Sequence, residues 1–316
     1  MTGWLIRRLF HVTLVMAIMS VVIYALIGLM PGDPIDLMIA ADPKMTPADA
    51  ERLRGLYGLD LPLTTRYWNW LSALLSGDPG YSRLYGQPVG AVLLPALAAT
   101  LKLLGLAFAL SLLIALPVGI IAGLRPQGAL DYGVNFVAFA GVSVPQFWLA
   151  LLLIILFAVQ LQWLPAGGPP PAGAGLQTTL THYILPVLCI TIASVGDHTR
   201  FIRASVIDVM RQDYIRTAIA KGAGPGRIIL RHTLRNAMLP VVTVIALDFG
   251  FLFSGALITE TMFAWPGMGK LIFDSMMGND FNLALVALLL ATFVTLAGNL
   301  LADIVYALLD PRIRYK

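Results

Sequence analysis

Long apolar stretches are the feature of this sequence that most restricts its fold. The hydrocarbon core of a bilayer is about 30 Å thick, so a helix needs roughly 20 mostly apolar residues to cross it. Only 12% of the residues are charged, against about a quarter in soluble domains. The sequence predicts an all-α, polytopic membrane protein with six transmembrane helices, at residues 9–30, 94–124, 133–161, 183–203, 237–259 and 283–308.

The first apolar stretch follows Arg7 and Arg8, as the apolar part of a secretory signal would. It is longer than the roughly 7–15 residues of such a signal, and it ends in Met30 and Pro31 without the small residues of a cleavage site. We therefore expect a retained helix. The chain then divides into the N-terminus with its first helix (1–30), an extracytoplasmic segment (31–93) and a five-helix core (94–316).

Lysine and arginine are distributed unevenly among the connecting segments. The 162–182 and 260–282 loops contain only Lys270 between them. Since short cytoplasmic segments carry an excess of positive charge, the segments expected inside are 1–8, 125–132, 204–236 and 309–316. Both termini are then cytoplasmic. This topology accounts for the net charge of +4, and no nucleic-acid partner is expected.

The extracytoplasmic segment carries two signs of helical structure. Thr46 followed by Pro47 is typical of a helix start and predicts a helix over about 47–57. Further on, "RYWNWLSALLSG" (66–77) groups aromatic and apolar residues that suit the membrane headgroup zone. A docking surface for an extracytoplasmic partner is equally compatible with this pattern.

No pattern typical of an enzyme occurs in the sequence. The stretch "GMGK" (267–270) lacks the upstream glycine and the following hydroxyl residue of a phosphate-binding loop. The one cysteine, Cys189, lies in the fourth apolar stretch as a small apolar filler. We expect no catalytic residue and no cofactor. No metal is expected either, because the histidines are scattered at helix ends and loops, at His11, His182, His198 and His232.

Charged residues within the apolar stretches are few, and each needs a partner or water to be tolerated there. Lys102 lies near the outer end of its stretch, where its long side chain reaches the interface. Asp303 lies near the cytoplasmic end of the last stretch, where a structural partner is favoured. Asp248 stands near the middle of "VTVIALDFGFLF". It either faces a water-filled translocation path or hydrogen-bonds to a neighbouring helix.

The basic stretch at 204–240 has the pattern of two short cytoplasmic helices. Apolar residues recur on one face from Ala204 to about Lys221. Gly222 fits a left-handed C-terminal position, and Pro225 fits the start of a second helix over about 226–235. Such a hairpin suits either acidic lipid headgroups or a groove on a cytosolic partner.

Within this stretch, "YIRTAIAKGAG" (214–224) resembles the signature loop of the permease subunits of bacterial ABC importers, in the form found in the peptide/nickel-type group. Arg216 and Thr217 stand where the general motif has an acid, so that acid's role does not apply here. The resemblance extends along nearly the whole chain, in order and spacing, through "LMPGDP" (29–34), "SVPQFWLALLLIILF" (143–157), "WLPAGG" (163–168), "ITETMFAWPGMGKLIFDSM" (258–276) and "YALLDPRIRY" (306–315).

The resemblance implies the type I importer permease fold in the bacterial inner membrane. It also implies a second homologous permease subunit, two cytosolic ATP-binding subunits that supply ATP hydrolysis, and an extracytoplasmic substrate-binding protein. The residues it assigns to coupling with the ATPase are Tyr214, Arg216, Thr217, Ala218, Lys221, Gly222 and Ala223. Those it assigns to an extracytoplasmic gate loop are Glu260, Phe263, Trp265, Pro266 and Gly267.

The expected cargo of this family is a di- or oligopeptide, with nickel, haem or another small solute as alternatives. Asp248 is then a translocation-path residue suited to the ammonium end of a peptide. A self-sufficient ion- or proton-coupled carrier is the competing interpretation, but it calls for intramembrane acid and base pairs and internal repeats. An intramembrane enzyme is least compatible with the sequence.

Overall fold

The computed structural model describes residues 2–29, 46, 51–52, 60–251 and 256–309. The chain divides into two compact units. One consists of Met1–Ala98 with Gly267–Val294, and the other of Ala99–Pro266 with Thr295–Lys316. Most of the described structure is helical, as expected for an all-α membrane protein.

The first unit is a set of helices with one short hairpin. Its strands pair in antiparallel fashion, with Tyr81 opposite Pro88 and Ser82 opposite Gln87. Its elements are α1 (Thr2–Gly28), α4 (Leu63–Leu75), β1 (Tyr81–Ser82), β2 (Gln87–Pro88), the first residues of α5 (Val89–Leu124), α13 (Met268–Met277) and the first residues of α14 (Phe281–Leu309).

Apolar side chains of α1 and α14 form one core of this unit, in which Ile23 and Ile27 pack against Leu285. The α4 helix lies on α1, where the Tyr67 hydroxyl is 2.8 Å from the Ser20 hydroxyl. The aromatic stretch predicted for the headgroup zone is thus partly buried within the chain. Only its other face, with Trp68 and Leu75, remains exposed.

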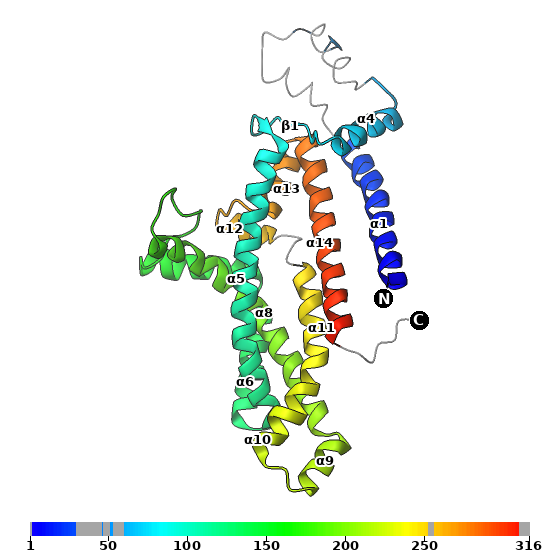
Figure 1. Ribbon diagram of the computed structural model, residues 1–316. Helices are drawn as coiled ribbons and strands as arrows, with labels where there is room; N and C mark the ends of the chain where they lie inside the picture. The colour runs from blue at the N-terminus through cyan, green and yellow to red at the C-terminus, as the bar shows by residue number, and fades with distance from the viewer. Residues whose placement is uncertain (1, 30–45, 47–50, 53–59, 252–255, 310–316) are drawn as a thin grey trace. The chain divides into compact units, whose positions relative to one another are not determined.

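The second unit packs its long helices around α8, with α6 and α11 both against it (Figure 1). The helices α10 and α11 are continuous through a π-helical segment. The elements are the rest of α5 and α14, α6 (Ala129–Ser143), α7 (Gln146–Leu153), π-helical η1 (Ile154–Gln160), α8 (Leu176–Met210), α9 (Asp213–Ala220), α10 (Pro225–Arg227), π-helical η2 (Ile228–Leu234), α11 (Arg235–Phe251) and α12 (Leu257–Met262).

Glycines allow α8 to approach its neighbours closely. Gly119 and Gly123 on α5 form a Gly-x-x-x-Gly pair, and a side chain at Gly123 would come within 2.7 Å of Val206. On another side of α8, a side chain at Gly196 would meet the Ala138 carbonyl of α6 at 2.6 Å. Small residues are the usual means of bringing membrane helices into backbone contact.

The predicted membrane spans are largely present. Among the described residues, α1, α5, α8 and α14 are long and apolar enough to cross a membrane, and a fifth span is possible if a bent pair counts as one. The fifth predicted span corresponds to α11, which has 17 described residues, and residues 252–255 after it lie outside the described part. The count of six is therefore consistent with the structure but not established by it.

The third predicted span, 133–161, is not a straight helix. It is the bent pair, in which α6 and the α7–η1 helix meet at 98°. Val144, between them, has extended backbone torsions. The reason is Pro145, since proline disfavours helical torsions in the residue before it and cannot donate a backbone hydrogen bond.

The basic stretch at 204–240 also differs from its prediction. The helix expected from Ala204 to Lys221 is broken at Arg211 and Gln212, where α8 ends and α9 begins. The second predicted helix, 226–235, does not stop but continues into α11 through Pro240. The helix predicted over 47–57 falls mostly outside the described residues.

Candidate functional site

The short helix α9 ends in a fixed cap built around Gly222. The Gly222 N–H donates to the Ile219 carbonyl at 2.9 Å, and the Ala223 N–H donates to the Ala218 carbonyl at 3.1 Å. These two bonds form a Schellman motif, which requires a left-handed residue between the helix and the next segment. Gly222 has φ +78°, so the predicted left-handed position is confirmed.

One apolar side chain attaches α9 to the rest of the second unit. Ile215 is 1% exposed and is the buried residue of α9, which packs against η2. Of the residues assigned to ATPase coupling, Ala218 and Ala223 are half-buried, whereas Tyr214, Arg216, Thr217, Lys221 and Gly222 are exposed. The structure therefore brings all seven into one solvent-facing knob.

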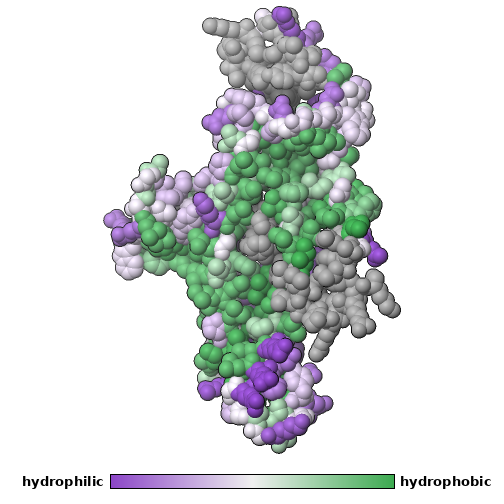
Figure 2. Space-filling view, viewed as in Figure 1, coloured by the Kyte–Doolittle hydropathy of each residue, from purple (hydrophilic) through white to green (hydrophobic). Residues whose placement is uncertain are grey.

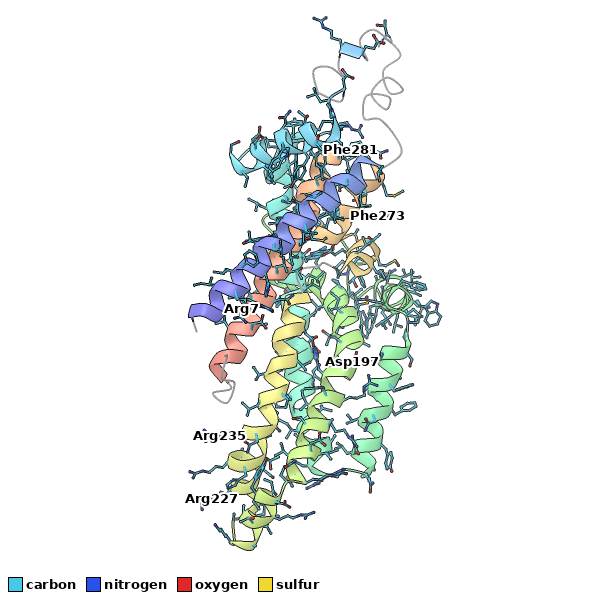
Figure 3. All side chains as sticks on the ribbon, turned by 90° about the vertical axis from the view of Figure 1, so that its right-hand side faces the viewer. Arg7, Asp197, Arg227, Arg235, Phe273 and Phe281 are labelled. Carbon is cyan, nitrogen blue, oxygen red and sulfur yellow. The ribbon has the colours of Figure 1, made fainter. Side chains whose placement is uncertain are left out.

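This knob lies at a strongly polar end of the second unit. Hydrophilic residues gather around α9 and α10 (Figure 2), and Figure 3 places Arg227 and Arg235 at the same end. Two exposed apolar side chains interrupt the polar surface, Ile219 at 55% and Leu230 at 71% exposure. A mixed apolar and basic surface of this kind suits a protein groove better than open water.

The helices behind the knob are tied together by polar contacts. The Ser205 hydroxyl on α8 donates to the Ala237 carbonyl on α11 at 2.7 Å. On the other side of α8, Arg203 binds both carboxylate oxygens of Asp131 on α6. Asp131 is buried and also accepts a bond from the Gln127 N–H, so this end of the bundle is rigid.

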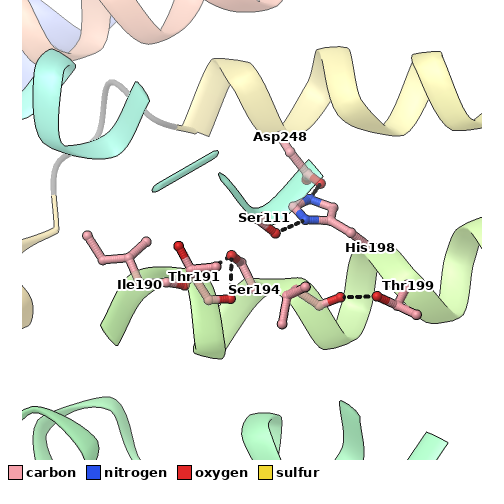
Figure 4. Close-up of polar contacts among 8 residues, drawn as sticks. Ser111, Ile190, Thr191, Ser194, His198, Thr199 and Asp248 are labelled. Carbon is pink, nitrogen blue, oxygen red and sulfur yellow. Dashed lines mark hydrogen bonds and ion pairs between the residues drawn. The ribbon is translucent and has the colours of Figure 1, made fainter. Parts of the chain in front are cut away.

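Within the membrane-spanning part, three polar side chains from three helices form a chain of hydrogen bonds (Figure 4). The Ser111 hydroxyl on α5 is 2.9 Å from His198 Nδ1 on α8. The other ring nitrogen, His198 Nε2, is 2.9 Å from Asp248 Oδ2 on α11. Ser111 and the His198 side chain are buried, whereas the Asp248 side chain is 40% exposed.

Of the two sequence alternatives for Asp248, the hydrogen bond to a neighbouring helix is confirmed, whereas the water-filled translocation path stays a prediction. The expectation that the histidines sit at helix ends and loops is wrong for His198, which lies inside α8, and for His11, which lies inside α1. Sequence reasoning missed His198 and Ser111 as partners of Asp248. A signal was available, because an acid within one apolar stretch and a histidine within another each require a polar partner.

Buried side chains hold the loop that the sequence predicts to be an extracytoplasmic gate. Glu260 and Phe263 are fully buried and Trp265 is 2% exposed. The Thr100 hydroxyl donates to Glu260 Oε1 at 2.6 Å, and the Trp265 indole N–H donates to the Ala99 carbonyl at 3.2 Å. These three side chains fix the loop rather than offer a surface to another protein.

The same loop is also bound to the segment after η1. The Gly168 N–H donates to the Phe263 carbonyl at 2.7 Å, and a side chain at Gly167 would come within 2.3 Å of that oxygen. Pro266 is exposed, and Gly267 is buried just before α13 in the first unit. Of the five predicted gate residues, Pro266 alone presents its side chain to the surface.

The remaining singled-out residues have ordinary surroundings. Lys102 is exposed on α5, in agreement with a side chain that reaches the interface. Cys189 is buried, and its thiol donates to the Gln146 carbonyl at 3.6 Å. In the part of the chain that the structure describes, no three His, Cys, Asp or Glu residues lie together as metal ligands would.

Comparison with known proteins identifies the family of this chain. Residues 115–315 match the family described as "Binding-protein-dependent transport system inner membrane component", and residues 1–88 match the N-terminal companion family. The chain belongs to this family of inner-membrane transport components. The prediction of an ABC-importer permease is confirmed, and the self-sufficient carrier is not favoured.

Three relatives resemble the chain along most or all of its length. The oligopeptide transport system permease protein AppB of Bacillus subtilis is 36% identical over 318 residues, covering 100% of both chains. The glutathione transport system permease protein GsiC of Pectobacterium atrosepticum is 36% identical over 316 residues, again covering 100% of both. A putative peptide permease of Brucella suis is 36% identical over 299 residues, covering 94% of each.

Membership in this family fixes the setting of the site. The chain is a multi-pass inner-membrane subunit that works with a substrate-binding protein and an ATPase. The helices of this chain therefore respond both to the ATPase, which supplies energy, and to the binding protein, which delivers the cargo.

Proposed function

We propose that this chain is a permease subunit through which an ABC importer passes di- or oligopeptides into the cell. The observation that carries the proposal is the end-to-end similarity to proteins whose names state peptide, oligopeptide or glutathione transport. The partly open acid of the second unit, Asp248, adds a chemical reason, since a carboxylate within a membrane suits a cargo with a positive end.

The complete importer, in this proposal, contains a second homologous permease, two cytosolic ATP-binding subunits and an extracytoplasmic binding protein. Both termini of this chain are cytoplasmic, and residues 31–93 lie outside. The chain has no nucleotide-binding site of its own, so ATP hydrolysis occurs in the partner subunits. The distribution of Lys and Arg supports this orientation.

The α9 knob is the proposed contact with the ATPase. Tyr214, Arg216, Thr217 and Lys221 form its exposed side, while Ile215 and the Gly222 cap hold it to the chain. Since α9 packs on η2, which continues into α11, a push on α9 moves the helix that carries Asp248. Movement driven by nucleotide binding is thereby passed on as rigid-body motion.

The 256–266 loop, continued by Gly267, is the proposed extracytoplasmic gate. Burial of Glu260, Phe263 and Trp265 supports a role in keeping the loop's shape rather than in touching the binding protein. Of the five gate residues, Pro266 is the exposed one, and we assign such a contact to it. On this proposal, loss of the Glu260 or Trp265 hydrogen bonds makes the gate leaky without affecting assembly.

Reconstitution tests the function directly. The chain is co-purified with its co-encoded permease, ATPases and binding protein, placed in proteoliposomes and supplied with ATP and a radiolabelled tripeptide. We expect ATP- and binding-protein-dependent accumulation, with no accumulation of nickel or haem in parallel vesicles. Accumulation of nickel or haem but not of the peptide would contradict the peptide assignment, and uptake without ATPase subunits would contradict the importer assignment.

A further inference from the structure

The hydrogen-bonded chain of Ser111, His198 and Asp248 joins three helices of one unit at a single point (Figure 4). The imidazole ring is fixed on a further side by Phe108, whose ring meets it edge to face at 5.9 Å between centroids. Both ring nitrogens have a partner, so the ring cannot rotate freely.

The Ser111 hydroxyl shares one hydrogen bond with His198 Nδ1, whose direction depends on the histidine tautomer. A hydroxyl proton needs an acceptor, and Nδ1 is the one to which the Ser111 side chain bonds among the described residues. If Nδ1 accepts that proton, the ring is neutral and carries its own proton on Nε2. His198 Nε2–H then donates to Asp248 Oδ2, and Asp248 is the ionised acceptor. With this tautomer the three side chains together carry one negative charge.

Asp248 uses one of its two carboxylate oxygens in this cluster. Oδ2 is bound to His198, whereas Oδ1 makes no hydrogen bond within the described residues, and the side chain is 40% exposed. No lysine or arginine among those residues forms an ion pair with it. A carboxylate at this depth needs water or a cation on its open side.

The arrangement does not suit nucleophilic chemistry, although it contains serine, histidine and aspartate. Ser111 is fully buried and bonds to Nδ1, so its oxygen cannot reach a substrate. The exposed end of the chain of bonds is the carboxylate. The cluster is therefore built to present a charge rather than to attack a bond.

We propose that Ser111 and His198 hold Asp248 as a fixed single negative charge that binds the α-ammonium group of a peptide in transit. This inference rests on the proposed function and names its substrate class, which is peptides with a free N-terminus. Peptides with an acylated N-terminus lack the cation and are carried poorly. His198 is a positioning residue, because it acts through Asp248 and does not itself touch the cargo.

Uptake of matched peptides by the complete importer in proteoliposomes tests this proposal. Trialanine is compared with N-acetyl-trialanine, each at a concentration that saturates the binding protein, so that delivery is equal for both. We expect native importer to favour trialanine by about tenfold or more, and Asp248→Asn to reduce this ratio to near one. Asp208→Asn is the control, because Asp208 is an exposed acid on α8 about 15 Å along the helix from His198.

Variants of His198 separate positioning from a merely structural role. The amide of His198→Gln can still donate to Asp248, so this variant keeps most of the preference for trialanine. His198→Leu cannot donate and loses the preference. Equal loss in both variants, with assembly and ATP turnover intact, would mean that His198 has only a packing role and would overturn the proposal.

The outcomes also separate this proposal from the proposed function. If native importer carries both peptides equally well, the ammonium site is wrong while the peptide permease stands. If it carries neither peptide, with ATP turnover intact, the peptide assignment itself fails. A native preference that survives in Asp248→Asn would place the selectivity in another subunit and would equally refute the site.

Discussion

The attachment of α9 through one side chain leads to a sharp prediction for Ile215→Ala. An isolated helix shorter than about 12–15 residues is marginal in water, and α9 has 8 residues. Its structure therefore depends on packing, and Ile215 is its buried contact at 1% exposure. Removing most of that side chain should release α9 while the long helices remain folded.

The size of the effect follows from the burial of Ile215. Truncating a fully buried isoleucine to alanine costs about 2–5 kcal/mol. Even the lower end raises the equilibrium constant for local opening by about 30-fold, since each 1.4 kcal/mol is a factor of ten. Trypsin sites at Arg216 and Lys221 lie within and just after α9 and report this opening. When cleavage is slower than reclosing, the cleavage rate rises by the same factor.

The assay is limited trypsin digestion of the full-length chain in detergent, followed by mass spectrometry of cleavage at Arg216 and Lys221. Ile219→Ala is the matched control, because it makes the same change on the same helix at a side chain that is 55% exposed. We expect native cleavage rates in the control and a rise of about 30-fold or more in Ile215→Ala. Equal rates in the two variants would refute the attachment of α9 through Ile215.

Two further predictions concern the helices behind α9. Gly123→Ala places a side chain 2.7 Å from Val206 and should lower the thermal unfolding midpoint, because such overpacking costs about 1–3 kcal/mol. Gly105→Ala is the control on the same helix and should leave the midpoint unchanged, since no atom lies within 4 Å of the added side chain. Arg203→Met leaves the buried Asp131 carboxylate without its guanidinium, which costs about 3–5 kcal/mol, and adding Asp131→Asn should restore part of the midpoint. Equal midpoints for the two glycine variants, or an unchanged midpoint in Arg203→Met, would contradict the respective contact.

Local features were accessible from the sequence because they depend on neighbouring residues. Apolar stretches of bilayer length predicted the spans, and all but the fifth have a described counterpart of sufficient length, one of them bent. Gly222 predicted the left-handed cap of α9, which the structure has at φ +78°. The bend at Pro145 was equally local and could have been predicted, since proline restricts the residue before it.

The break between α8 and α9 was harder to predict from the sequence. The apolar residues from Ala204 to Lys221 keep one helical period across it, and Arg211 and Gln212 contain no glycine or proline to mark a stop. What separates the two helices is the packing of Ile215 against the rest of the unit, which α9 achieves by turning away from the α8 axis. Periodicity alone carries no information about such a turn.

The sequence by itself determined that this chain is a helical membrane permease, because length, polarity and motif order are properties of the chain alone. Tertiary structure decided what its polar residues do. His198 is 50 residues from Asp248 and 87 from Ser111, yet the three share one line of hydrogen bonds. Glu260 has the polarity of a surface residue and is buried. Such contacts depend on the rotation and depth of each helix, which packing between helices sets and no single helix encodes.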